Sequence, residues 1–211
     1  PYAAPYTAPE GFVPDRVVSV DIAALSLLPE NARPYGERID LAIDHHPSQG
    51  FFARETCLEA DSAACGEIVY DIITRLTPVT PDIALPLYVA VSTDTGCFKF
   101  SSTKASTHIT AAKLMEAGAH VEELNTLLFD TKSRERMEAE RIARNHLEYH
   151  LDGRCALIYL TRDEIEQSRV DPADLEELTS LPISIEGVKV GLTLRQQPGG
   201  SYRISVRTAK G

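Results

Sequence analysis

Short apolar runs alternate with longer stretches of helical periodicity in the first half of the chain. Residues 16–23 (RVVSVDIA) and 39–46 (IDLAIDHH) are apolar runs that finish in acidic or imidazole side chains. Such runs are typical of buried parallel strands, which need apolar side chains on both faces. Apolar residues at helical spacing follow, with Asp61 or Ser62 as the first cap. Helices are therefore expected over 61–76, 80–95 and 106–117.

The second half begins with a densely charged segment and ends in two alternating runs. Residues 133–150 carry a narrow apolar stripe and predict a connecting helix. A strand is expected over 155–160, followed by one helix that starts at Thr161 and another at Asp171, each with capping residues. Polarity alternates over 188–195 and 202–207 around Gln-Pro-Gly-Gly, which indicates a hairpin.

The pattern as a whole indicates an α/β protein of two units. Residues 1–131 are expected to form a parallel-sheet domain, residues 132–152 the connecting helix, and residues 153–211 a smaller α/β domain. The length allows two such cores.

Charge and composition narrow the class of protein. The net charge of -10 disfavours binding to long duplex nucleic acid or to an anionic membrane by bulk electrostatics. The stretch 187–211 has five basic residues and no acidic one, so a small phosphorylated ligand is a candidate for this tail. No apolar run approaches the roughly 20 residues of a membrane span, and the four cysteines form no CxxC pair. A cytoplasmic location is expected.

Acidic and imidazole side chains end both predicted strands. Asp21 ends the first strand, and Asp44, His45 and His46 end the second. Parallel strands bring such ends to one sheet edge, where open α/β folds bind ligands. Asp94, at the end of the second helix, is a further acidic candidate. Carboxylate and imidazole ligands without thiolate suit Mn²⁺, Fe²⁺ or Mg²⁺.

The combination of Ile43-Asp-His-His-Pro47 with Ser92-Thr-Asp-Thr-Gly-Cys-Phe98 resembles the DHH phosphoesterase family. This resemblance implies that Asp21 bridges two metal ions and that His45 and Asp94 are further metal ligands. It implies that Asp44 orients imidazole as part of the catalytic group, and that His46 contacts the substrate phosphate.

The same resemblance extends to the second unit. Residues 1–131 would be the DHH domain, and residues 153–211 the DHH-associated nucleotide-binding domain. In that domain Ser205 and Arg207 match a Ser-x-Arg sequence that contacts substrate phosphates.

Two family features are missing. The first motif, a histidine and paired aspartates that complete the two-metal site, is not in this sequence, and neither is a glycine-rich loop after Arg207. We expect the chain to be truncated at both ends.

The expected function is hydrolysis of phosphate esters, as an exonuclease or a phosphatase, with two divalent metal ions, Mn²⁺ being the expected metal. Short oligonucleotides, dinucleotides or nucleoside bisphosphates such as pAp would be substrates, and a homodimer is possible. Two cations would activate a bridging water and neutralise charge on the phosphoryl group. The alternative is a non-catalytic nucleotide-binding or regulatory protein on a degenerate DHH scaffold.

Overall fold

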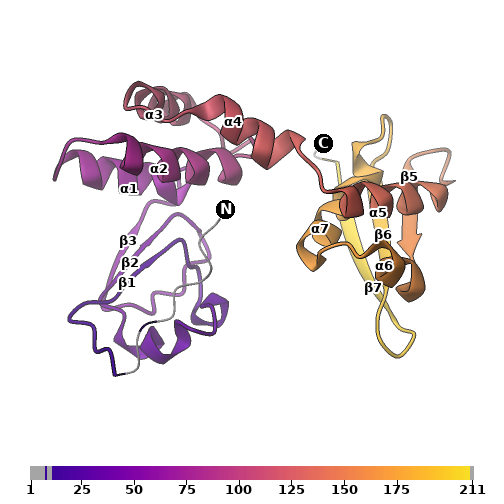
Figure 1. The fold of residues 1–211 in the computed structure, drawn as a ribbon, viewed down its shortest axis with the longest axis horizontal. Helices are drawn as coiled ribbons and strands as arrows, with labels where there is room; N and C mark the ends of the chain where they lie inside the picture. Colours follow the sequence, from indigo (N-terminus) through magenta and orange to yellow (C-terminus); the bar gives the residue numbers. More distant parts are fainter. Residues whose placement is uncertain (1–7, 9–10, 210–211) are drawn as a thin grey trace. The chain divides into compact units, whose positions relative to one another are not determined.

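The computed structural model describes residue 8 and residues 11–209. The chain divides into two units, Pro1–Asp130 and Thr131–Gly211 (Figure 1). Each unit contains its own sheet and its own apolar core. None of the described helices is long and apolar enough to cross a membrane.

The first unit is built on a parallel sheet, as the apolar runs predicted. Its strands are β1 (Val18–Val20), β2 (Leu41–Asp44) and β3 (Glu55–Leu58), in the order β1-β2-β3. Both strand pairs are parallel. Strand β1 ends before the apolar run does, because the backbone of Asp21 turns away with a φ of 63°. The sequence analysis missed β3, whose four residues are only half apolar and carry little periodic signal.

The helices of the first unit are α1 (Cys65–Thr74), α2 (Pro81–Asp94), α3 (Ala105–Glu116) and the short α4 (Val121–Asn125), which continues into a π-helical turn over Thr126–Asp130. Figure 1 shows α1, α2 and α3 on the same side of the sheet. Ile68 and Cys65 of α1 pack against Ile43 of β2. Helix α2 runs beside α1, where a Cβ on Gly66 would lie 3.0 Å from the Cβ of Ala90.

The start of α1 corrects one prediction. Asp61 and Ser62 were expected to cap this helix, but the cap position is Ala64. The carboxylate of Glu67 accepts hydrogen bonds from the backbone N–H groups of Ala63 (2.7 Å) and Ala64 (3.3 Å). A side chain inside the helix therefore satisfies donors that the expected cap residue would have satisfied. Ser62 is left in the preceding loop.

The second unit contains a mixed sheet in the order β4-β5-β6-β7. Its elements are α5 (Arg134–Asn145), β4 (Glu148–His150), β5 (Cys155–Leu160), α6 (Arg162–Ser168), α7 (Pro172–Glu177), β6 (Val190–Gln196) and β7 (Tyr202–Thr208). Strands β5 and β6 are parallel, and β6 and β7 form the expected antiparallel hairpin. Two 3₁₀ turns, Leu178–Ser180 and Pro182–Ser184, lie between α7 and β6.

The charged helix is shorter than predicted. It ends at Asn145, and the residues expected to continue it form β4, which pairs with β5. The turn between these strands has positive φ at Leu151, Asp152 and Gly153, which reverses the chain. Buried Ala139 and Ala143 of α5 pack in the core of the second unit. The division into a DHH domain, a connecting helix and an associated domain stays a prediction.

Glu140 of α5 is a buried carboxylate surrounded by cations. Its side chain is 5% exposed, and it accepts from Lys132 (2.8 Å) and pairs with Arg136 (3.4 Å) and Arg144 (3.7 Å). Burial alone would raise the pKa of Glu140, but the hydrogen bond from Lys132 and the surrounding cations hold it below its usual range. The carboxylate therefore stabilises the folded state in its ionised form.

The variant Glu140→Gln is expected to lower the free energy of unfolding by about 1–3 kcal/mol, because it leaves the three surrounding cations without the counter-charge of the buried carboxylate. Since the folded pKa is lowered, this contribution is present above the ordinary glutamate pKa of about 4.3 and disappears as the pH falls through the folded value. Denaturant titrations of both proteins should therefore differ at neutral pH and converge in acid. Glu138→Gln, which removes the exposed pair with Arg141, is the matched control and should change little.

Candidate metal centre

Asp21 lies at the carboxyl edge of the first sheet. Its N–H donates to the carbonyl of Ile43 at 3.0 Å, so the pairing with β2 continues one residue beyond β1. The left-handed backbone of Asp21 then takes the chain off the sheet. Aspartate tolerates this conformation better than a bulky residue does. Its side chain, 47% exposed, is left at the sheet edge next to the end of β2.

Asp44 ends β2 and is fully buried. Its Oδ1 accepts from the backbone N–H groups of His45 (2.7 Å) and His46 (3.2 Å) and from Nδ1 of His46 (2.7 Å). Its Oδ2 accepts from Nε2 of Gln49 at 2.7 Å. Burial alone would raise the pKa of Asp44, but the hydrogen bonds from His46 and His45 and the charge of His46 lower it. Asp44 is therefore an ionised anchor for the backbone after β2 and for the imidazole of His46.

The ring of His45 is oriented by the loop before α1. Its Nδ1 lies 3.1 Å from the carbonyl oxygen of Ser62. A carbonyl only accepts, so Nδ1 carries the proton and Nε2 points the other way. Nε2 lies 3.0 Å from Oδ2 of Asp94 and 3.5 Å from Oδ1 of Asp21. Nε2 is buried and has no hydrogen-bond partner among the described residues.

Asp94 is the last residue of α2, and its carboxylate lies beside Nε2 of His45. The buried hydroxyl of Thr95 donates to the carbonyl of Val91 (2.7 Å) and accepts from the N–H of Phe98 (3.1 Å), which fixes the turn after the helix. Gly96 has a φ of 56°, and a Cβ there would lie 2.5 Å from the ring of Phe100, so a larger residue would displace that ring. Burial raises the pKa of Asp94; nearby His45 opposes this, and the negative charge of Asp21 raises it further.

His46 faces a different direction. Its side chain is 41% exposed, and the hydrogen bond from Nδ1 to Asp44 raises the pKa of His46. The raised pKa favours the imidazolium, which carries a positive charge at the open side of the cluster. This is the charge that a phosphate contact requires.

The donor set fits a divalent cation. Ligand atoms of Asp21, Asp44, His45 and His46 lie within 4.8 Å of one another. Asp44, however, is fully buried with both oxygens engaged, so we assign it to orientation rather than to coordination. A lone pair on Nε2 of His45 that faces two carboxylates is electrostatically unfavourable, and a cation between them would remove the conflict. Asp21, His45 and Asp94 are the residues that would hold it.

Cys65 is close to the cluster but does not change its chemistry. Burial, and next the charge of Asp21, raise the pKa of Cys65 to about 12. Its thiol donates to the carbonyl of Ile43 at 3.3 Å. Because the sulfur stays protonated, it is not a thiolate ligand, and the cluster keeps the oxygen and nitrogen character expected from the sequence.

The two substrate-binding candidates of the second unit lie on β7. Ser205 is half-buried and Arg207 is exposed, and they share one face of the strand because they are two residues apart. Nη2 of Arg207 donates to the hydroxyl of Thr179 at 3.4 Å. Within their own unit the two side chains are therefore neighbours, as the Ser-x-Arg pattern requires.

Two supporting residues were missed by the sequence analysis. Nε2 of Gln49, a residue only 4% exposed, donates to Oδ2 of Asp44 and to the carbonyl of Ile22 (2.8 Å). It thereby connects the turn at Asp21 with the end of β2. Glu67 holds the loop whose Ser62 carbonyl orients His45. A polar residue three positions after a histidine pair was the only signal for Gln49, and it did not reveal burial.

Comparison with known proteins finds relatives of this chain that are named as phosphoesterases. No protein-family model matches the sequence. The chain is 26% identical over 213 aligned positions to the bifunctional oligoribonuclease and PAP phosphatase NrnA of Thermus thermophilus, covering all of this chain and 59% of that protein. It is 23% identical to the probable NrnA of Streptococcus mutans, covering 80% of this chain and 54% of that one.

A solved structure agrees with the fold. An exopolyphosphatase-related protein from Bacteroides fragilis superposes with a TM-score of 0.81 at 23% identity, over 93% of this chain and 59% of that one. The resemblance to a DHH-family phosphoesterase and the α/β fold class are confirmed. The chain spans between 54% and 59% of the length of these relatives.

Proposed function

We propose that this chain is part of a metal-dependent phosphoesterase that hydrolyses short oligonucleotides, dinucleotides or nucleoside bisphosphates such as pAp in the cytoplasm. The names of the relatives from Thermus thermophilus and Streptococcus mutans, both oligoribonucleases and PAP phosphatases, support the reaction class and the substrate size.

The metal dependence is inferred from the position of Nε2 of His45. This atom is buried, has no hydrogen-bond partner among the described residues, and faces the carboxylates of Asp21 and Asp94. With Nδ1 directed to the carbonyl of Ser62, a neutral imidazole presents the lone pair of Nε2 beside two carboxylates, a ligand set suited to a divalent cation. A divalent cation, Mn²⁺ being our proposal, supplies charge neutralisation at the phosphoryl group and a water nucleophile at neutral pH.

The other residues position the substrate and the ligands. Oδ1 of Asp44 holds the backbone N–H of His45 and the imidazole of His46 in place. His46 in its charged form donates to a phosphate oxygen from its exposed side. Asp21, with its half-exposed carboxylate, would hold the cation together with His45 and Asp94. In the second unit, Ser205 and Arg207 hold a phosphate remote from the cleaved bond.

The proposal is tested by assaying the full-length protein on pAp and on a diadenylate with added Mn²⁺, and again in excess chelator. Hydrolysis of either substrate that requires the metal supports the proposal. Hydrolysis in excess chelator contradicts the metal dependence. Binding of these nucleotides without turnover at any added metal indicates the non-catalytic nucleotide-binding protein instead.

Arg207→Ala is expected to raise KM for short oligonucleotides by about 3- to 10-fold with little change in kcat, because an exposed guanidinium that holds a remote phosphate contributes mainly to binding. Bis-p-nitrophenyl phosphate lacks the remote nucleotide parts, so its hydrolysis should change little. Arg154→Ala, another exposed arginine of the second unit, is the control. An equal loss on both substrates would place Arg207 at the reacting phosphate or in the folding of the unit.

A further inference from the structure

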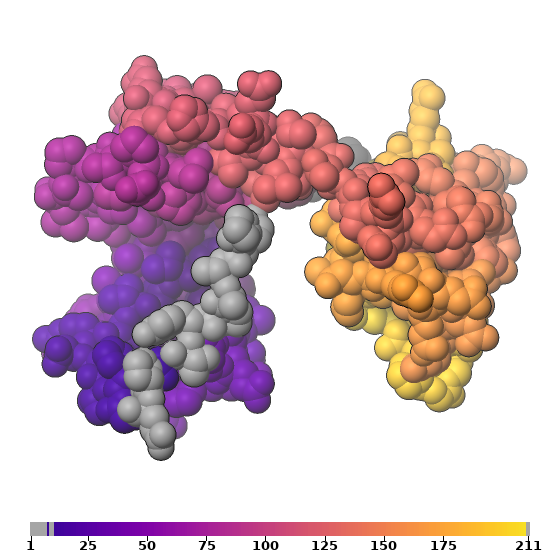
Figure 2. Space-filling view, in the orientation of Figure 1, coloured from indigo at the N-terminus to yellow at the C-terminus, as the bar shows by residue number. Residues whose placement is uncertain are grey.

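A second concave site of the second unit includes Arg203 of β7, four residues before Arg207 on the same strand. It is a pocket of about 360 Å³ at the carboxyl ends of the parallel strands β5 and β6, where the chain enters α6 and the β6–β7 turn. Figure 2 shows the surfaces of the α6–α7 segment and of the β6–β7 turn next to each other. The carboxyl edge of parallel strands is where open α/β folds bind ligands.

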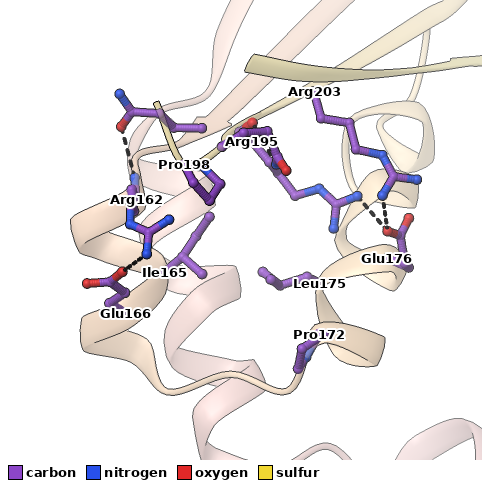
Figure 3. A pocket seen from close by; sticks show the side chains of 11 residues that line it. Arg162, Ile165, Glu166, Pro172, Leu175, Glu176, Arg195, Pro198 and Arg203 are labelled. Atoms are coloured by element: carbon purple, nitrogen blue, oxygen red, sulfur yellow. Dashed lines mark hydrogen bonds and ion pairs between the residues drawn. The ribbon is translucent and has the colours of Figure 1, made fainter. Parts of the chain in front are cut away.

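Arginines form the walls of this pocket. Figure 3 shows two ion-paired groups on opposite sides, Arg162 with Glu166 and the pair Arg195 and Arg203 with Glu176. Nη2 of Arg195 and Nη1 of Arg203 approach the same oxygen of Glu176, at 2.6 and 3.0 Å. Two guanidiniums thus share one acceptor atom, in a protein whose overall charge is strongly negative.

Arg195 differs from the other arginines of the pocket in its burial. Its side chain is 6% exposed, and its Nε is buried with no hydrogen-bond partner among the described residues. Glu176, which it contacts, is 48% exposed, so one side of this ion pair is open to solvent. A buried guanidinium has five donors, and leaving some of them unmet is costly. A ligand with several acceptor oxygens would satisfy donors that Glu176 alone does not satisfy.

The pocket also has an apolar part. Ile165 and Leu175 lie between the two ion-paired groups, and Pro172 and Pro198 complete the lining on either side (Figure 3). A bare inorganic anion would leave this surface uncovered. The volume falls at the lower end of the range for small-molecule sites, about 300–1,000 Å³, which suits an organic body of the size of a nucleoside.

We propose that this pocket binds a nucleoside monophosphate, with the phosphate between Arg195 and Arg203 and the organic part over Ile165 and Leu175. Glu176 occupies the guanidiniums when the ligand is absent and competes with the phosphate for them. The site needs no metal ion, so it does not depend on the proposed hydrolysis at the first unit.

A purely structural role for the same residues makes different predictions. If the pair of Arg195 and Glu176 only clamps β6 to α7, Glu176→Gln lowers stability and changes no binding. If the pocket is an anion site, the same substitution removes a competitor and tightens phosphate binding by about 3- to 10-fold. Glu176→Gln therefore separates the two roles, and its thermal unfolding can be measured in parallel.

The experiment is a titration of the ¹⁵N-labelled chain with AMP in excess chelator, followed through its amide NMR signals. We expect saturable shifts at Arg162, Glu176 and Gln196, and much weaker effects of adenosine or of inorganic phosphate at equal concentration. Arg203→Gln, which changes a side chain that is 59% exposed, should weaken AMP binding by about fivefold or more. Arg141→Gln, an ion-paired arginine of α5, is the matched control and should leave the affinity unchanged.

Arg207→Ala distinguishes this pocket from the neighbouring substrate-binding candidates. It should leave AMP binding at the pocket unchanged. The inference is overturned if AMP shows no saturable binding, if adenosine binds equally well, if inorganic phosphate alone reproduces the affinity of AMP, or if Arg207→Ala and not Arg203→Gln abolishes the shifts.

Discussion

His45→Ala in the full-length protein is expected to abolish Mn²⁺-dependent hydrolysis while the fold is retained. The substitution removes Nε2 of His45, the nitrogen that lies 3.5 Å from Asp21 and 3.0 Å from Asp94. Replacing a residue that only supports the metal ligands typically lowers metal affinity or activity by about 10- to 100-fold. Loss of a direct ligand should lower them further. The measurements are the initial rate at saturating Mn²⁺, the metal affinity by calorimetry, and the circular dichroism spectrum.

The matched control for this substitution is His150→Ala. His150 is an exposed histidine of β4 that pairs with Glu148, and it belongs to the second unit. The His150→Ala variant should have nearly full activity and unchanged metal affinity. Full turnover by the His45 variant, or unchanged metal affinity with lost turnover, would contradict the assignment of His45 as a ligand.

Gln49→Met is expected to weaken metal affinity by about 10- to 100-fold, although Gln49 would not touch the metal. Methionine keeps the volume of the side chain but donates no hydrogen bond. Oδ2 of the fully buried Asp44 and the carbonyl of Ile22 then lose their shared donor. The turn that presents Asp21 is no longer held to the end of β2, so the ligands lose their common orientation.

The same substitution should also reduce the free energy of unfolding by about 1–3 kcal/mol, because a buried carboxylate oxygen is left without its donor. Calorimetric metal titration and denaturant unfolding measure the two effects separately. Gln167→Met, on the exposed face of α6, is the control and should change neither quantity. Lost stability with unchanged metal affinity would show that Gln49 supports the fold alone and does not position the ligands.

Local patterns predicted much of the fold. The helix from Pro81 to Asp94 and the strand from Cys155 to Leu160 appear close to where periodicity and capping residues placed them. Helices follow from contacts between residues three and four apart, so a short window of sequence contains most of the signal. Strand β3, with no such local signal, is specified by its pairing with β2 and was missed.

The sequence by itself determined which chemical groups are present at the candidate metal centre. Asp21, Asp44, His45, His46 and Asp94 are recognisable because strand ends and short motifs are local features. Their convergence also follows in outline from the parallel order of the strands, whose carboxyl ends share one edge.

Only the tertiary structure decided how each group is held there. The carbonyl of Ser62 sets the proton of His45 on Nδ1, and burial turns Asp44 into an anchor with no free oxygen. The carboxamide of Gln49 reaches the carbonyl of Ile22, 27 residues earlier in the chain, and also the carboxylate of Asp44. Proton positions, burial and such bridges arise from groups that meet only when distant segments pack together, so no local pattern in the chain encodes them.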